Sequence, residues 1–266
     1  MPVAISNSPH NEHRGVLLVG HGTRHEKGRG EFLETAKLVA SRLRTEIVRS
    51  CFLELAEPNM REGISQLVHD GAESIVVVPV FLFAAQHWKR DIPNEIKAAQ
   101  RTHPNLQIRM ARHLGDHQAV MQLSLQRFEE AMARTEDSFA KTETATLMVG
   151  RGGSDQTAIN EMLVFARQRE SLSPVAQHAT CFLAKARPTV AEAFESLRNS
   201  SHQLVVVQPH ILFHGELIDD LRTRVEEMDN AASTQRWVTT DPLGFSNLLV
   251  TALVARFRET RFDSIN

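Results

Sequence analysis

The stretch that decides the fold runs from Val16 to Thr23 and reads Val-Leu-Leu-Val-Gly-His-Gly-Thr. Four consecutive apolar residues that run into glycines are typical of a buried parallel strand whose end faces a ligand. Because Gly20 and Gly22 lack side chains, the backbone can turn sharply there and a large flat molecule can approach it closely. His21 is therefore the side chain that this strand end presents.

The same stretch returns as residues 147–153, Leu-Met-Val-Gly-Arg-Gly-Gly, with the histidine gone. Further matches lie at the same separation of 130 residues: Cys51-Phe52-Leu53 with Cys181-Phe182-Leu183, Pro58 with Pro188, Pro79 with Pro209, and Phe83 with Phe213. Anchors at one spacing indicate a duplicated βαβαβαβα unit. Alternating strands and helices imply parallel sheets with right-handed crossovers, an α/β fold.

Apolar runs place the strands of the first unit. The expected strands are Val16–Gly20, Ile47–Glu54, Ser74–Phe83 and Leu106–Ala111. Pro58 suits the first turn of the helix after the second strand, and Val120–Ala133 is expected to close the unit. The expected division is a disordered tail at 1–14, a first lobe with the active site at 15–133, a linker at 134–144, and a second lobe without the metal site at 145–266.

Composition excludes several classes of function. The chain is 42% hydrophobic and 23% charged with a net charge of −2, so no general affinity for nucleic acid or membrane surfaces is expected. Two cysteines cannot supply four thiolates to an iron–sulfur cluster and form no disulfide framework. With no apolar signal segment in residues 1–14 and no run of about 20 apolar residues, a cytoplasmic protein is expected.

Three polar side chains stand at or just past successive strand ends: His21, Glu54 and His87. Ligands bind beyond the carboxyl ends of parallel strands, so these side chains converge if the strands are neighbours. Two imidazoles and a carboxylate suit a mid-to-late first-row divalent metal, or proton transfer near neutral pH. Their counterparts in the second unit are Arg151, Ala184 and Leu217. One copy therefore carries the chemistry, and the other supports it.

Structural readings compete with these assignments. Glu54 alone suits a helix N-terminal charge near Pro58. His210 and His214, on the equivalent of the third strand, either line the same cleft or have a structural role. Basic residues near the site favour a polyanionic ligand, but solvated helix faces explain them equally well: Arg24, Lys27, Arg29, Lys89 and Arg90. The chain has neither a complete glycine-rich phosphate loop nor a GxSxG nucleophile elbow.

At these residues the chain resembles the sirohydrochlorin chelatases of the CbiX/SirB type, within the class II tetrapyrrole chelatases. The matching motifs are Leu18-Val19-Gly20-His21-Gly22-Thr23-Arg24, Phe52-Leu53-Glu54-Leu55 with Glu57-Pro58, and Val78-Pro79 through Phe83-Ala84-Ala85-Gln86-His87 to Asp91-Ile92-Pro93. The resemblance implies two flavodoxin-like three-layer αβα lobes with a tetrapyrrole between them. It also implies insertion of Co²⁺ or Fe²⁺, with Ni²⁺ also acceptable, into sirohydrochlorin with loss of two pyrrole protons, in cobalamin or sirohaem biosynthesis.

On this resemblance His21 and His87 hold the metal, and Glu54 is a ligand, a base or an orienting group. The expected tetrapyrrole-binding residues are Gly20, Gly22, Arg24, Phe83, Ala84, Ala85, Lys89 and Arg90. No organic cofactor and no iron–sulfur cluster are expected. Because the two units are fused where the short form dimerises, a monomer is expected. Protoporphyrin ferrochelatases place their site histidine in the second lobe, where this chain has Arg151.

Two other functions remain open at this point. One is a different metal-dependent or proton-transfer enzyme that uses His21, Glu54 and His87. The other is a carrier that binds a tetrapyrrole or a metal and releases it unchanged.

Overall fold

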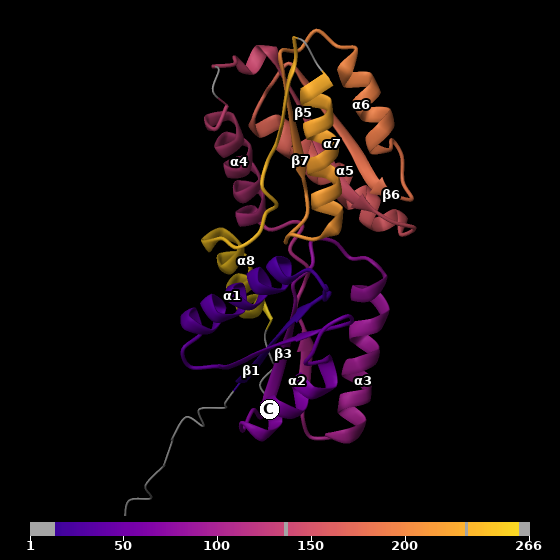
Figure 1. Ribbon diagram of the computed structural model, residues 1–266. Coiled ribbons are helices and arrows are strands. Elements are labelled where there is room, and N and C mark those ends of the chain that lie inside the picture. Colours follow the sequence, from indigo (N-terminus) through magenta and orange to yellow (C-terminus); the bar gives the residue numbers. More distant parts are fainter. Residues whose placement is uncertain (1–13, 136–137, 232–233, 261–266) are drawn as a thin grey trace, which may run out of the picture.

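Two parallel four-stranded sheets, one from each half of the sequence, form the framework of the protein (Figure 1). The computed structural model describes residues 14–135, 138–231 and 234–260. The tail expected at 1–14 lies outside these residues except for Arg14, which begins the first strand. The strand orders are β2-β1-β3-β4 and β6-β5-β7-β8, so the predicted duplication and the parallel α/β fold are confirmed.

The first sheet lies in the lower half of Figure 1. Its strands are β1 (Arg14–Gly20), β2 (Ile47–Phe52), β3 (Ser74–Pro79) and β4 (Gln107–Met110). The helices of this half are α1 (Glu26–Arg42), α2 (Met60–His69), the π turn η1 (His87–Asp91), α3 (Ile92–Thr102) and α4 (Gln118–Ala133).

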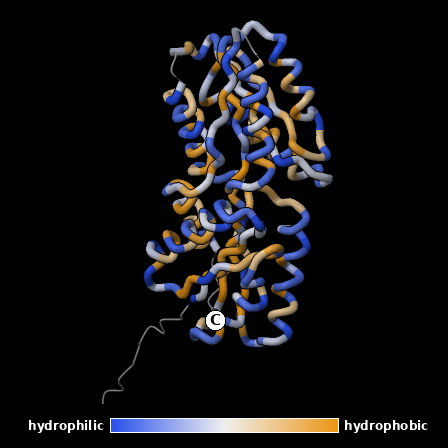
Figure 2. The backbone as a smooth tube through the Cα atoms, in the orientation of Figure 1, coloured by the Kyte–Doolittle hydropathy of each residue, from blue (hydrophilic) through white to orange (hydrophobic). Residues whose placement is uncertain are grey.

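Alternation along β1 makes both faces of the first sheet apolar. Val16 and Leu18 pack in the cluster that contains α1, whereas Leu17 and Val19 pack with α2 and α3. None of the four is more than 1% exposed, as expected of a strand covered on both faces. Figure 2 shows the same division over the whole molecule, with hydrophobic strands inside and many hydrophilic residues on the helices outside.

The second sheet lies in the upper half of Figure 1, and the second half of the sequence repeats the order of elements. Its strands are β5 (Thr144–Gly152), β6 (Gln177–Ala184), β7 (Leu204–Pro209) and β8 (Arg236–Thr239). Its helices are the 3-10 turn η2 (Lys141–Glu143), α5 (Gln156–Leu172), α6 (Val190–Arg198), α7 (Glu216–Ala231) and α8 (Asn247–Glu259). Leu147 and Val149 of β5 pack with α6 and α7, and Met148 packs with α5.

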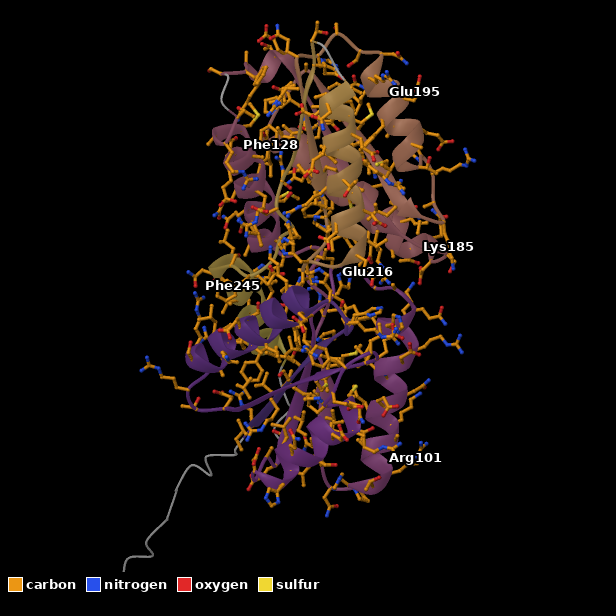
Figure 3. All side chains as sticks on the ribbon, in the orientation of Figure 1. Arg101, Phe128, Lys185, Glu195, Glu216 and Phe245 are labelled. Carbon is orange, nitrogen blue, oxygen red and sulfur yellow. The ribbon has the colours of Figure 1, made fainter. Side chains whose placement is uncertain are left out.

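The last helix of each half packs on the sheet of the other half. Phe128 of α4 lies against Leu204 and Val206 of β7, and Figure 3 labels it in the upper part of the molecule. Leu253 and Phe257 of α8 join the cluster beside β1, β3 and α1. We therefore define the first lobe as the first sheet with α1, α2, α3 and α8, and the second lobe as the second sheet with α4, α5, α6 and α7. We propose residues 134–144 as the linker between the two sequence repeats. The lobes in space do not follow this division, because they exchange their last helices.

Several elements near the strand ends are shorter than expected. β2 ends at Phe52 rather than Glu54, and β3 ends at Pro79 rather than Phe83. Residues 80–86 form a loop instead, because an apolar run by itself does not separate a buried strand from a buried loop. Pro58 precedes α2 rather than starting it, since Asn59 is the N-cap and forms a capping box with Glu62.

Among the described residues, none of the helices combines the length and the apolar character needed to cross a membrane.

Candidate active site

His21 and Glu54 lie side by side because backbone pairing continues past the ends of β1 and β2. The Leu53 amide donates to the Gly20 carbonyl at 3.0 Å, and the Glu54 amide donates to the His21 carbonyl at 3.1 Å. β1 lies between β2 and β3, so the expectation that these three strands are neighbours is confirmed. Their carboxyl ends form one edge of the first sheet.

The glycines beside His21 allow close packing. A Cβ on Gly22, whose φ is +98°, would lie 1.7 Å from the Glu54 carbonyl oxygen, so only glycine fits there. A Cβ on Gly20 would lie 3.0 Å from the Phe32 ring of α1. In the second half a Cβ on Gly152, with φ +73°, would lie 2.0 Å from the Ala184 carbonyl oxygen. The tight turn therefore belongs to the duplicated fold, and only the polar side chains are specific to the first half.

His87 reaches the same edge from the loop that follows β3. It is the first residue of η1, a single π turn that continues directly into α3. The His21 and His87 rings meet edge to face, with centroids 4.7 Å apart and an interplanar angle of 80°. His87 Nδ1 lies 2.7 Å from Oδ2 of Asp91.

His21, Glu54 and His87 form a three-residue cluster with the geometry of a metal site. One ligand atom from each residue can be chosen so that all three atoms lie within 4.8 Å of one another. His21 Nδ1 is 3.3 Å from Oε1 of Glu54, while His21 Nε2 is buried and has no hydrogen-bond partner among the described residues. The side chains are 24%, 46% and 33% exposed in chain order, so an arriving ion can reach them. We call these three residues the triad.

Burial lowers the pKa of His21 below its ordinary value. The charges of Arg151 and His87 act in the same direction, and Glu54 opposes them. The imidazole therefore stays neutral near pH 7, which is the form that binds metals and accepts protons. Arg151 belongs to the second lobe and is the repeat counterpart of His21, so the triad faces the boundary between the lobes.

The family model described as CbiX matches the chain twice, over residues 15–131 and 145–260. The chain belongs to the CbiX family. A sirohydrochlorin ferrochelatase of Priestia megaterium is 29% identical over 231 residues, which cover 86% of this chain and 84% of that protein. A sirohydrochlorin cobaltochelatase of the same organism is 30% identical over 247 residues, 92% of this chain and 79% of that protein. The solved structure described as SirB from Bacillus subtilis with Fe³⁺ is 26% identical with a TM-score of 0.82, covering 93% of this chain and 95% of that one.

In this member of the CbiX family, the second lobe contacts the segment that carries His87. Glu161 of α5 accepts a hydrogen bond from the Ala84 amide at 3.0 Å. Asp155, the N-cap of α5, contacts the Lys89 ammonium of η1 at 2.9 and 3.0 Å. Sequence reasoning missed Asp155 and Glu161, because no spacing relates α5 to residues more than sixty positions earlier. The second lobe therefore contributes to the site by holding a segment of the first.

The residues expected to bind a tetrapyrrole have varied surroundings. Arg24 and Arg90 are exposed, Lys89 is paired with Asp155, Ala84 is buried and Ala85 is half-buried. The Phe83 ring lies 5.4 Å from the ring of His210.

His210 and His214 lie outside the triad. The ring of His210 is buried between Phe83 and Phe165, whose ring centroids are 5.4 and 4.1 Å away. His214 joins the lobes, because its Nδ1 lies 2.6 Å from Oε1 of Glu31 and its Nε2 lies 2.9 Å from Nζ of Lys27.

A pocket of about 340 Å³ opens beside the triad on the side of α2 and α3. Glu54 and His87 line it, together with Asp91 and Glu95. This side of the triad is therefore open to water and to hydrated cations.

Proposed function

We propose that this protein is a sirohydrochlorin chelatase, an enzyme that inserts a divalent metal ion into sirohydrochlorin with release of two pyrrole protons. The observation that carries the proposal is the triad, two imidazoles and a carboxylate with ligand atoms within 4.8 Å of one another. Membership of the CbiX family supports the substrate class, because relatives of this chain are named sirohydrochlorin ferrochelatase and sirohydrochlorin cobaltochelatase.

The metal ion is a substrate in this reaction, and the chain supplies groups that hold it and accept protons. His21 and His87 hold the ion through neutral imidazole nitrogens, and the lowered pKa of His21 keeps that ring unprotonated. Glu54 acts as a third ligand or as a base. Each pyrrole N–H gives its proton to a base as the nitrogen binds the metal, so the metallated ring leaves with two protons fewer. The pocket beside Glu54 and His87 connects these groups to water.

We propose that the tetrapyrrole binds at the boundary between the lobes. Gly20 and Gly22 leave room for the ring edge, and Arg24, Lys89 and Arg90 are suited to its carboxylates. Phe83, Ala84 and Ala85 belong to the loop that leads to His87. Since Lys89 is paired with Asp155, a ring carboxylate has to share or replace that partner.

Co²⁺ and Fe²⁺ are the proposed metals, and Ni²⁺ also suits the donor set. Cys51 and Cys181 are both free and buried, in keeping with the proposed cytoplasmic location. We propose a monomer, because both sheets are supplied by one chain.

The test is turnover. The protein mixed anaerobically with sirohydrochlorin and Co²⁺ or Fe²⁺ should accelerate the visible-spectrum change of metallation over the rate without protein. We expect His21→Ala and His87→Ala each to lower this rate by at least ~10²-fold, as for loss of a positioned proton-transfer group. His69→Ala, at an exposed position of α2, is the matched control and should retain the full rate.

A carrier would change the spectrum only in proportion to the amount of protein added. Near-wild-type rates in both triad variants would contradict the chelatase assignment.

A further inference from the structure

Asp91 is the residue that holds the outer nitrogen of His87. Its Oδ2 lies 2.7 Å from His87 Nδ1, at the distance of a charge-assisted hydrogen bond. The two residues are the first and last of η1. Both side chains are partly exposed, 33% for His87 and 46% for Asp91, so neither is held by close packing alone.

This contact determines which nitrogen of His87 is free. A carboxylate only accepts hydrogen bonds, so the hydrogen of the neutral ring lies on Nδ1. The lone pair is then on Nε2. His21 is arranged in the same way, since its Nδ1 lies 3.3 Å from both Glu54 Oε1 and the Gly22 carbonyl oxygen, and its buried Nε2 has no partner among the described residues. Both rings thus offer Nε2 as the donor atom.

The π turn that carries this pair has no counterpart in the other copy. In the second half the equivalent segment is α7, a regular α-helix over Glu216–Ala231. The positions equivalent to His87 and Asp91 are Leu217 and Leu221. Single π turns inside helices occur frequently at functional sites. The helical distortion, the imidazole and the carboxylate therefore occur together in the half that holds the triad.

We propose that Asp91 is a positioning residue for metal insertion. It fixes His87 in the tautomer with hydrogen on Nδ1 and orients the ring so that Nε2 binds the incoming ion. This inference rests on the proposed function and adds to it a residue outside the triad. Such outer carboxylates typically change metal affinity by about 10- to 100-fold when they are removed.

The test measures the tautomer and the metal affinity separately. Long-range ¹H–¹⁵N NMR of protein labelled at histidine reports which nitrogen of His87 carries the hydrogen, with the signal assigned through His87→Gln. In metal-free wild type we expect hydrogen on Nδ1. In Asp91→Ala we expect His87 to lose that preference and Co²⁺ to bind about 10- to 100-fold more weakly, as read from visible absorption.

Two further variants separate positioning from charge and from general damage. Glu95→Gln removes a negative charge from the same pocket, one turn along α3; it should leave the Nδ1 hydrogen in place and weaken Co²⁺ binding less than Asp91→Ala does. Asp91→Glu keeps a carboxylate and should recover the Nδ1 hydrogen and part of the Co²⁺ affinity.

The inference is overturned if Asp91→Ala keeps the Nδ1 hydrogen or the full Co²⁺ affinity, or if Glu95→Gln weakens Co²⁺ binding equally. Failure of the proposed function is a separate result, because absence of turnover by wild type is measured with sirohydrochlorin, whereas the tautomer is read without any substrate.

Discussion

Gly22 has no room for a side chain, since it faces the carbonyl oxygen of Glu54 at φ +98°. Its counterpart Gly152 faces Ala184 in the same way, but no triad residue lies beside it. This pair separates the role of the turn in folding from its role in placing Glu54.

We expect Gly22→Ala and Gly152→Ala each to lower the free energy of unfolding by more than ~1 kcal/mol, because φ is positive and the added Cβ displaces a carbonyl group. Only Gly22→Ala should also weaken Co²⁺ binding, since it shifts the backbone of Glu54. Denaturant unfolding and Co²⁺ titration measure the two effects. Gly30→Ala, in α1 with nothing within 4 Å, is a control expected to be neutral or stabilising by about 0.5–1 kcal/mol. Unchanged Co²⁺ affinity in Gly22→Ala would contradict this account.

Among the elements, α4 and α8 each carry an arginine that binds the opposite half. Arg127 of α4 donates to the carbonyl oxygens of Pro242 and Leu243 at 3.0 and 3.1 Å. Arg256 of α8 donates to the carbonyl oxygen of His113 at 2.8 Å and also binds Asp116. Each arginine binds the loop that follows the last strand of the other half, so the helix exchange is reciprocal.

We expect Arg256→Leu to destabilise the protein by roughly 1–3 kcal/mol, because the His113 carbonyl loses a charged donor. Arg258→Leu, an exposed position two residues further along α8, should change stability by less than about 0.5 kcal/mol. Thermal unfolding of both variants provides the comparison. Equal stability of the two would show that the arginine does not fasten α8 to the first lobe.

At the scale of the whole molecule, the exchanged helices join the two lobes into one unit. Each sheet has one face completed by a helix from the other half of the sequence, since β3 packs against α8 and β7 against α4. The sequence repeats should therefore unfold together. His210 lies at the boundary, between Phe83 of the first lobe and Phe165 of the second.

His210 makes the stability of this unit sensitive to acid. Burial lowers the pKa of His210 to about 3, whereas the unfolded chain has the ordinary value of 6.5. Between these values only the unfolded state takes up the proton, so stability falls as the pH falls, by about 1.4 kcal/mol per pH unit from this residue. We expect His210→Leu to remove this contribution. Urea unfolding at several pH values measures the slope for both proteins, and equal slopes would contradict the assignment.

Much of the fold follows from patterns along the chain. The spacing of 130 residues indicates the duplication, and the buried runs locate the centres of the strands. β3 ends earlier than its apolar run predicts, because Val80 and Ala84 are buried although they lie in the loop 80–86 and not in the strand. Among the described residues, the triad could be found from the sequence because its members follow three neighbouring strands and are missing from the second copy.

The sequence by itself determined the parallel α/β architecture, its duplication and the three residues of the triad, because each depends on local periodicity or on a comparison of the two halves. Only the tertiary structure decided that α4 and α8 each pack on the sheet of the other half. It also decided that Arg151 lies close enough to lower the pKa of His21, that Asp155 and Glu161 bind the segment before and after His87, and that Asp91 contacts His87. Apolar helices of similar length can cover either sheet, and contacts between distant segments follow from how the chain packs, so no spacing in the sequence specifies them.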